Sequence, residues 1–218
     1  ERQGEGQLVN LANRWENFYA NNMQWFSEIN NDIVGRFSRH WQSATIEILT
    51  SAATHPYLPL LLTDEAIDAQ LKLGTMTTLQ HFGRPAKGIW LPELAYRPGC
   101  HQWTPPVIFN QSRERVGIEE FLVKSDITHC FIDGPVAKRA DVIGVMREGR
   151  WRSVNSTELG NTEHLSRQHL LSPIGMVSSF EAPEVIALLR HPALSRQVWS
   201  AQLGYPGAPP YLDFHKRD

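Results

Sequence analysis

The sequence has few cysteines, no long apolar run and no excess of positive charge. Cys100 and Cys130 are the only two cysteines in 218 residues, too few for the disulfide framework of a small secreted protein, and they suit a reducing cytosol. No apolar stretch reaches the roughly 18 residues expected of a membrane-spanning helix. The formal net charge is −2 and no basic stripe is present, which argues against nucleic acid or an anionic membrane as the main partner.

Motifs for phosphate and metal binding are also absent. No Gly-rich phosphate loop or nucleotide-binding fingerprint occurs. Cys100 lies next to His101, but no second cluster of Cys or His has the spacing of metal ligands, so we expect no zinc, no other metal and no cofactor. The N-terminal ERQGEGQ lacks an initiator Met and the apolar segment of a signal peptide, so we expect a trimmed chain or a piece of a longer one.

The remaining composition is that of an ordinary globular protein, with 41% hydrophobic and 20% charged residues. Seven tryptophans and five tyrosines suit a protein that stacks sugars on aromatic rings, although ordinary cores also use these residues. We see no internal repeat or linker, so one domain over residues 1–218 is the simplest expectation.

The spacing of apolar residues predicts helices alternating with short strands. One apolar stripe through residues 8–40 predicts a single long helix, and Asp64 is expected to cap a second helix over 64–82. The other predicted elements are a short helix over 117–125, strands at 46–49, 88–91, 128–132 and 185–189, and a hairpin near 142–154 inside a loop-rich insertion over 134–172. This alternation is typical of parallel β/α units.

Polar residues follow these predicted strands: His55, Glu93, Asp133 and Arg190. In a parallel β/α barrel the active site lies where the strands end. Glu93 is the main candidate because a carboxylate held by a rigid strand beside aromatic rings can attack a sugar anomeric carbon. Its alternative is a surface loop residue paired with Arg97. His55 can equally hydrogen-bond the backbone, and Asp133 can orient Arg190 or cap the following turn.

Three long segments resemble glycoside hydrolase family 57. GIWLPELAYRPG (88–99) resembles the nucleophile motif of that family, and IEILTSAATHPYLPLL (46–61) resembles its second motif region in the 1,4-α-glucan branching enzymes. RQVWSAQLGYPGAPPYLDFHKRD (196–218) resembles the branching-enzyme segment with a Tyr-Pro-Gly-Asp-type loop. The resemblance extends from about residue 8 to the end, and residues 134–172 match poorly.

The resemblance implies an α/β fold, an incomplete (β/α)7 barrel of parallel strands surrounded by helices. It implies retaining transglycosylation of α-1,4-glucan chains to 6-hydroxyl acceptors, with Glu93 as nucleophile and an α-glucan such as glycogen, amylose or starch as partner. A cytoplasmic enzyme of glycogen or starch metabolism is expected. The expected substrate-binding residues are His55, Trp90, Tyr96, Arg97, Arg190 and Gly207.

Several features of the family pattern are missing. The His-rich first strand, the acid/base aspartate and the helical C-terminal domain have no counterpart in these 218 residues. We therefore expect an interior fragment of the catalytic barrel that is inactive alone, since a proton donor typically contributes roughly 10²–10⁴-fold. No tyrosine occurs between Tyr96 and Tyr205, where branching enzymes carry one on a loop. A family 57 α-amylase or 4-α-glucanotransferase, and a non-catalytic α-glucan-binding module, therefore remain alternatives.

Overall fold

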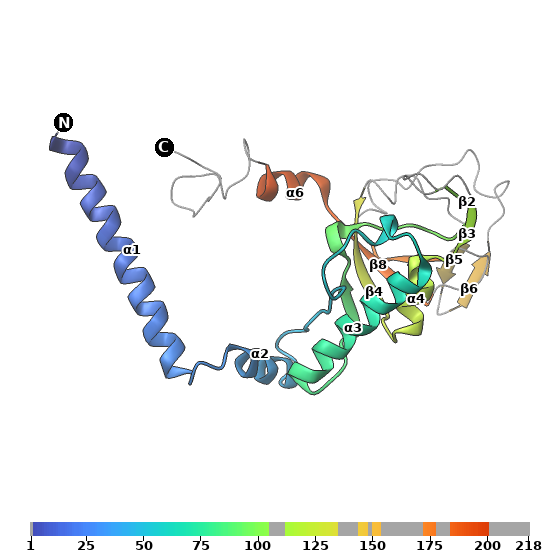
Figure 1. The fold of residues 1–218 in the computed structure, drawn as a ribbon, viewed down its shortest axis with the longest axis horizontal. Helices are drawn as coiled ribbons and strands as arrows, with labels where there is room; N and C mark the ends of the chain where they lie inside the picture. The colour runs from blue at the N-terminus through green and yellow to red at the C-terminus, as the bar shows by residue number, and fades with distance from the viewer. Residues whose placement is uncertain are drawn as a thin grey trace. The chain divides into compact units, whose positions relative to one another are not determined.

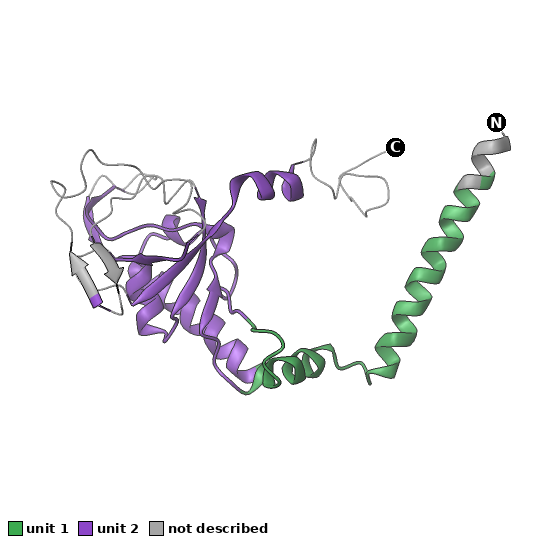
Figure 2. Cartoon of the chain, turned by 180° about the vertical axis from the view of Figure 1, so that it is seen from behind, with its two compact units in different colours: residues 1–48, 81–83 green, residues 49–80, 84–218 purple. Residues whose placement is uncertain are grey.

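The computed structural model describes residues 2–104, 112–134, 144–147, 150–153, 172–177 and 184–200. Contacts divide the chain into two units, one of residues 1–48 and 81–83 and one of residues 49–80 and 84–218 (Figure 2). Each unit has its own set of internal contacts. None of the described helices is both long and apolar enough to cross a bilayer.

The first unit is built from two helices, α1 (Arg2–Glu28) and α2 (Ile33–Gln42). The prediction of one continuous helix over 8–40 was therefore wrong. Asn30 and Asn31 adopt left-handed backbone angles, with φ of 56° and 59°, which asparagine tolerates better than most residues. The Asp32 carboxylate then accepts a hydrogen bond from the Gly35 N–H at 2.7 Å and caps α2. In this unit Trp41 is buried and packs edge-on against Phe82.

The second unit contains a four-stranded sheet in the order β1-β4-β8-β7, whose central strands β4 and β8 are labelled in Figure 1. β1 (Gly88–Trp90), β4 (His129–Asp133) and β8 (Val185–Arg190) are parallel, and β7 (Ile174–Met176) is antiparallel to β8. The three parallel strands confirm the predictions at 88–91, 128–132 and 185–189, but the sheet is mixed because of β7. Residues 46–49 form no strand, and only the next residue, Thr50, pairs in parallel with Ile89.

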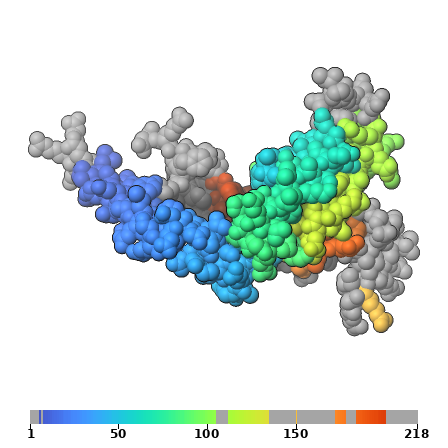
Figure 3. Space-filling view, turned by 60° about the horizontal axis from the view of Figure 1, so that its bottom comes forward, coloured from blue at the N-terminus to red at the C-terminus, as the bar shows by residue number. Residues whose placement is uncertain are grey.

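Two helices pack against one face of the sheet. α3 (Asp64–Phe82) agrees with the prediction for 64–82, and α4 (Ile118–Lys124) with that for 117–125. Figure 3 shows α3 and the 112–134 segment side by side on the surface. Beneath them lies an apolar core formed by side chains of both helices and of alternating strand positions. Its fully buried members include Ile67, Leu71, Ile89, Ile118, Leu122, Cys130 and Ala187.

The opposite face of the sheet is more open. Trp90 and Phe131 occupy paired positions in neighbouring strands, and their rings stack with centroids 5.5 Å apart. Trp90 is 37% exposed and Ile186 is 46% exposed. The sheet therefore has one face packed by helices and one face whose aromatic and aliphatic side chains remain accessible in the described structure.

Shorter elements connect these parts. One antiparallel pair, β2 (Cys100–Trp103) with β3 (Arg113–Arg115), was not predicted. A second pair, β5 (Gly144–Arg147) with β6 (Arg150–Ser153), confirms the hairpin expected near 142–154. Short helices are η1 (Leu58–Leu60), η2 (Pro92–Leu94) and α6 (Pro192–Trp199).

The central strand β4 carries Cys130, whose burial, with a smaller contribution from Glu119, raises the thiol pKa to about 12.

Candidate active site

The carboxyl ends of the parallel strands bring the predicted site residues to one edge of the sheet. The Thr50 segment, β1, β4 and β8 all run in the same direction. Glu93 follows β1, whereas Asp133 and Arg190 are the last residues of β4 and β8. In open parallel sheets ligands bind in the crevice outside these ends. The topology thus agrees with the location predicted from the strand ends.

Glu93 lies in an unusual turn. Its backbone angles are φ 55° and ψ 18°, and Leu94 follows with φ 52°. Two successive left-handed residues that are not glycine are rare and cost free energy, so their surroundings must hold them in place. Here Pro92 and Leu94 are buried, and the Leu94 N–H donates to the Leu91 carbonyl at 2.8 Å. The turn presents the Glu93 side chain to solvent while both neighbours point into the protein.

The second turn at this edge carries His55, which is also left-handed at φ 55°. The Ser51 hydroxyl links it to β1, because Ser51 Oγ donates to the Trp90 carbonyl at 3.0 Å and lies 3.2 Å from His55 Nδ1. The Thr54 N–H also donates to Gln70 Oε1 of α3 at 2.9 Å. His55 is therefore held next to the end of β1 by side-chain hydrogen bonds.

A shallow groove of about 310 Å³ lies beside this turn. Its lining includes Ser51, Gly74, Thr77, Thr78 and Trp90. Hydroxyl groups of this kind are suited to contact with a sugar, because they can hydrogen-bond to it. The groove is open and largely lined by small side chains, so it offers a surface more than an enclosed pocket.

Asp133 and Arg190 form a pair at the ends of β4 and β8. They are directly paired in the sheet register, and Arg190 Nε and Nη2 both lie 3.3 Å from Asp133 Oδ1. Each side chain is about one-third exposed, at 33% for Asp133 and 34% for Arg190. Of the two interpretations offered for Asp133, the contact favours the orientation of Arg190.

Tyr96 and Arg97 have contacts inside the protein. The Tyr96 hydroxyl donates to Glu119 Oε2 at 2.8 Å, and Glu119 is buried. Arg97 does not pair with Glu93 among the described residues; its Nη2 lies 3.9 Å from Asp64 Oδ1 and donates to the Val116 carbonyl at 2.9 Å. Burial, and then the nearby positive charge of Arg115, lower the pKa of the Arg97 guanidinium. A substrate contact for these two residues stays a prediction.

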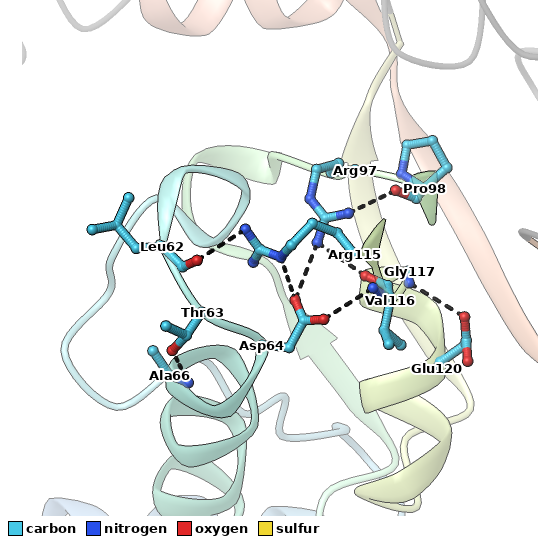
Figure 4. Close-up of polar contacts among 10 residues, drawn as sticks. All are labelled: Leu62, Thr63, Asp64, Ala66, Arg97, Pro98, Arg115, Val116, Gly117 and Glu120. Carbon is cyan, nitrogen blue, oxygen red and sulfur yellow. Dashed lines mark hydrogen bonds and ion pairs between the residues drawn. The ribbon is translucent and has the colours of Figure 1, made fainter. Parts of the chain in front are cut away.

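Asp64, Arg97, Arg115 and Val116 form a cluster that the sequence did not reveal (Figure 4). The Asp64 carboxylate accepts hydrogen bonds from Arg115 Nε at 2.5 Å and from the Val116 N–H at 3.0 Å. We call this group the Asp64 cluster. Asp64 was expected to cap α3, but the Ala66 N–H donates to the Thr63 hydroxyl instead. Arg115 lies 51 positions from Asp64, so no local pattern could have paired them.

Other candidates lie apart from this edge or outside the described residues. Gly207 falls in the C-terminal segment that the structure does not describe. His101 pairs with Glu114 in the β2–β3 hairpin, and both side chains are exposed. Within the described ranges no three His, Cys, Asp or Glu side chains gather as ligands of a metal ion would.

Comparison with known proteins identifies relatives for nearly the whole chain. Residues 9–212 match the family model of glycosyl hydrolase family 57. The chain is 35% identical over 201 residues to the 1,4-alpha-glucan branching enzyme TK1436 of Thermococcus kodakarensis, which covers 92% of this chain and 27% of that enzyme. The chain therefore spans about a quarter of the length of this curated relative.

Solved structures give the same picture. The GH57-type branching enzyme of Pyrococcus horikoshii matches with a TM-score of 0.70 and 33% identity, covering 94% of this chain and 32% of that one. The alpha-amylase AmyC of Thermotoga maritima matches with a TM-score of 0.58 and 26% identity, covering 88% of this chain and 28% of that one. A branching enzyme and an alpha-amylase thus share the arrangement of these elements.

Proposed function

The chain belongs to glycosyl hydrolase family 57, and from that premise we propose that it carries the nucleophile of a 1,4-α-glucan branching site, with Glu93 in that role. One observation supports this assignment above the others. Glu93 is an exposed carboxylate on a left-handed turn at the carboxyl end of a parallel strand, between two buried neighbours. Backbone strain of this kind concentrates at functional sites.

In a retaining mechanism the Glu93 carboxylate attacks the anomeric carbon and the α-1,4 glycosidic bond breaks. The leaving 4-oxygen takes a proton from an acid, and the glycosyl group stays on Glu93 as an ester. The 6-hydroxyl of an acceptor chain then attacks the same carbon, loses its proton to the conjugate base and releases the carboxylate. Branching and hydrolysis differ only in whether a sugar hydroxyl or water attacks in this second step.

The proton donor needs a second carboxyl group about 5–5.5 Å from the nucleophile. Asp133 is a carboxylate at the same edge, but Arg190 already donates to it from a paired strand position. This contact suits Asp133 to orient a substrate-binding guanidinium. We propose that the acid/base is a residue other than the described ones, in agreement with the aspartate implied by the family resemblance.

Trp90, His55, Arg190 and Gly207 are proposed to contact the glucan around Glu93. Among these residues the role has the best support for Trp90, because its partly exposed ring is stacked on Phe131 and offers a flat surface to a sugar. For Tyr96 and Arg97, the contacts with Glu119, Val116 and Asp64 favour support of the protein over contact with substrate. The described sheet is proposed to be part of an incomplete (β/α)7 barrel.

A second enzymatic candidate is hydrolysis or disproportionation of α-glucan at the same site. The likeness to the alpha-amylase of Thermotoga maritima favours it, as does the lack of tyrosine between Tyr96 and Tyr205. A glucan-binding role without catalysis is the third candidate. All three place an α-glucan at this edge of the sheet, and they differ in what becomes of the glycosyl group.

The test replaces one carboxylate in the intact protein. We expect Glu93→Gln to lower the transfer rate on amylose on the order of a thousandfold or more while glucan binding persists. Iodine staining and the chain profile after debranching separate branching from hydrolysis. Glu184→Gln is the matched control, because Glu184 is an exposed carboxylate just before β8, at the opposite edge of the sheet. Full activity of the Glu93→Gln protein would overturn the nucleophile assignment.

A further inference from the structure

We propose that the Asp64 cluster, together with the Tyr96–Glu119 hydrogen bond, is a positioning device that holds the carboxylate of Glu93 in its reactive orientation. This inference rests on the proposed function, because it assigns support residues to that nucleophile. Asp64, Tyr96, Arg97, Arg115 and Glu119 are thus positioning residues, which act through the turn without touching substrate.

The turn at Glu93 needs support from the residues before it and from the residues after it. Before Glu93, the chain is fixed because β1 pairs with β4 and with Thr50, and because Leu91 and Pro92 are buried. After Glu93, the chain leaves the sheet without a strand partner until β2 begins at Cys100. A left-handed pair of residues would relax if this second side were free. The residues that follow the turn therefore decide whether Glu93 keeps its orientation.

Burial holds the first residues after Glu93 in place. Leu94 is 1% exposed and Ala95 is 5% exposed, and the Ala95 N–H donates to the Pro92 carbonyl at 3.1 Å. The Tyr96 hydroxyl then reaches the buried Glu119 carboxylate on α4 at 2.8 Å. Three successive residues after Glu93 are thus attached to the core or to α4.

Arg97 fixes the end of the segment through its backbone and its side chain. Its carbonyl accepts the Ile118 N–H at 3.1 Å, and its guanidinium donates to the carbonyls of Val116 and Pro98, each at 2.9 Å. The side chain is only 11% exposed. A guanidinium that donates in several fixed directions holds geometry better than a flexible ammonium group.

Asp64 holds the two arginines together. It begins α3, where a negative charge is favourable, and it neutralises Arg115, whose side chain is 1% exposed. Without this carboxylate, the two guanidinium groups would lose the negative charge that lies closest to both, a loss that is costly in a largely buried place. Asp64 therefore connects the start of α3, the approach to α4 and the segment after Glu93.

The experiment measures how fast Glu93 is glycosylated in the intact protein. An α-glucosyl fluoride is the substrate, because fluoride leaves with little need for a proton donor and the rate then reports the nucleophile. We expect Asp64→Asn to slow this step by about 10- to 100-fold, since small misplacements of a reacting group have effects of this size. KM for maltooligosaccharides should stay within about twofold of the wild-type value, because the contacts that bind substrate and transition state equally are unaffected.

Milder variants and a matched control complete the design. Tyr96→Phe should slow glycosylation several-fold, and Arg97→Lys should recover part of the rate that Arg97→Ala loses. Asp68→Asn makes the same chemical change one turn further along α3, where the carboxylate pairs only with exposed Lys72 among the described residues. It should leave the rate unchanged. If Asp64→Asn does not fold by circular dichroism, the Tyr96→Phe rate decides the test.

Two results would overturn the inference. One is a wild-type rate of glycosylation in folded Asp64→Asn or Tyr96→Phe protein. The other is an increase in KM at constant kcat for the Arg97 variants, which would make Arg97 a substrate contact. The outcome is separable from that of the proposed function, because an active Glu93→Gln protein would refute the nucleophile itself, whatever the Asp64 variants do.

Discussion

Two turns at the carboxyl edge of the sheet share one backbone feature but are held by different forces. The 51–56 turn has His55 at φ 55°, and the 91–97 turn has Glu93 at the same φ of 55°. Hydrogen bonds of partly exposed side chains, from Ser51 to Trp90 and from Thr54 to Gln70, hold the first. Buried apolar side chains and the Asp64 cluster hold the second.

The difference shows how the carboxyl end of one sheet can carry both a turn that must stay rigid and a turn that can adjust. Burial and buried charge pairs fix a turn in one geometry, because any relaxation exposes apolar surface or separates charges. Hydrogen bonds near solvent are exchanged with water at little cost, and each contributes modestly to stability. We infer that the 91–97 turn is the more rigid, as a nucleophile requires, and that the 51–56 turn can adjust to a ligand.

Truncating the buried side chain of the 91–97 turn should have the largest effect. Leu94 is 1% exposed, and Leu94→Ala should lower the free energy of unfolding by about 2–5 kcal/mol through the cavity that it leaves. Urea denaturation of the intact protein followed by circular dichroism measures this loss. Leu60→Ala is the control beside the other turn, since Leu60 is 55% exposed. Equal losses at both positions would remove the contrast between the turns.

A methyl group added near the 51–56 turn should have the next largest effect. Gly74 of α3 lies so close to this turn that an added Cβ would be 1.9 Å from the Ser51 carbonyl oxygen. In an unconstrained helix Gly→Ala stabilises by about 0.5–1 kcal/mol, whereas here we expect a loss of about 1–3 kcal/mol. Thermal unfolding gives the sign, with Thr77→Ala on the exposed side of α3 as control. A stabilised Gly74→Ala protein would show that the approach of helix and turn is loose.

Glycine in place of Glu93 or of His55 should give a smaller change of the opposite sign. Glu93→Gly should raise the free energy of unfolding by about 1 kcal/mol, because glycine adopts positive φ without the penalty of a Cβ. The same protein should have no transferase activity, as expected where a strained residue is functional. His55→Gly should gain less, because it also loses the contact between Ser51 Oγ and His55 Nδ1 at 3.2 Å. Denaturant midpoints of the two variants measure the difference, and a destabilised Glu93→Gly protein would contradict the strain argument.

The smallest effect is expected at Ser51. Ser51→Ala removes the hydrogen bond to the Trp90 carbonyl at 3.0 Å, which should cost about 0.5–1 kcal/mol. Hydrogen exchange should show faster opening of the amides at 53–55 and no change at 94–97. A change that spreads to the 91–97 turn would mean that the two turns are coupled.

Local patterns were sufficient to predict the elements that lie under the site. The helix at 64–82 has apolar spacing and glycine beyond its end, and the strand at 88–91 stops at Pro92. The polar residues at the strand ends followed from the parallel topology. Residues 46–49 were predicted as a strand because they are apolar and β-branched, but only Thr50 reaches a partner in the described structure.

Features set by tertiary contacts or by rare backbone angles were missed. The helix break at Asn30 and Asn31 interrupts an apolar stripe that continues on both sides, so periodicity alone could not detect it. The strands β2 and β3 consist of Cys, His, Gln, Trp, Arg and Glu without a regular apolar alternation. The role of Asp64 depends on Arg115 and Arg97, which only the folded chain brings to it. A helix-start interpretation was the natural one for an isolated Asp before an apolar run.

The cysteine in the middle of β4 provides a natural reporter of the sheet opening. Cys130 is fully buried and its thiol pKa is raised to about 12, so a reagent that needs the thiolate should modify it only when the strand separates from its neighbours. Cys100, which is less buried, should react at a rate set by local access. A rise in Cys130 labelling relative to Cys100 labelling under mild denaturant would therefore report opening of the sheet without any engineered probe.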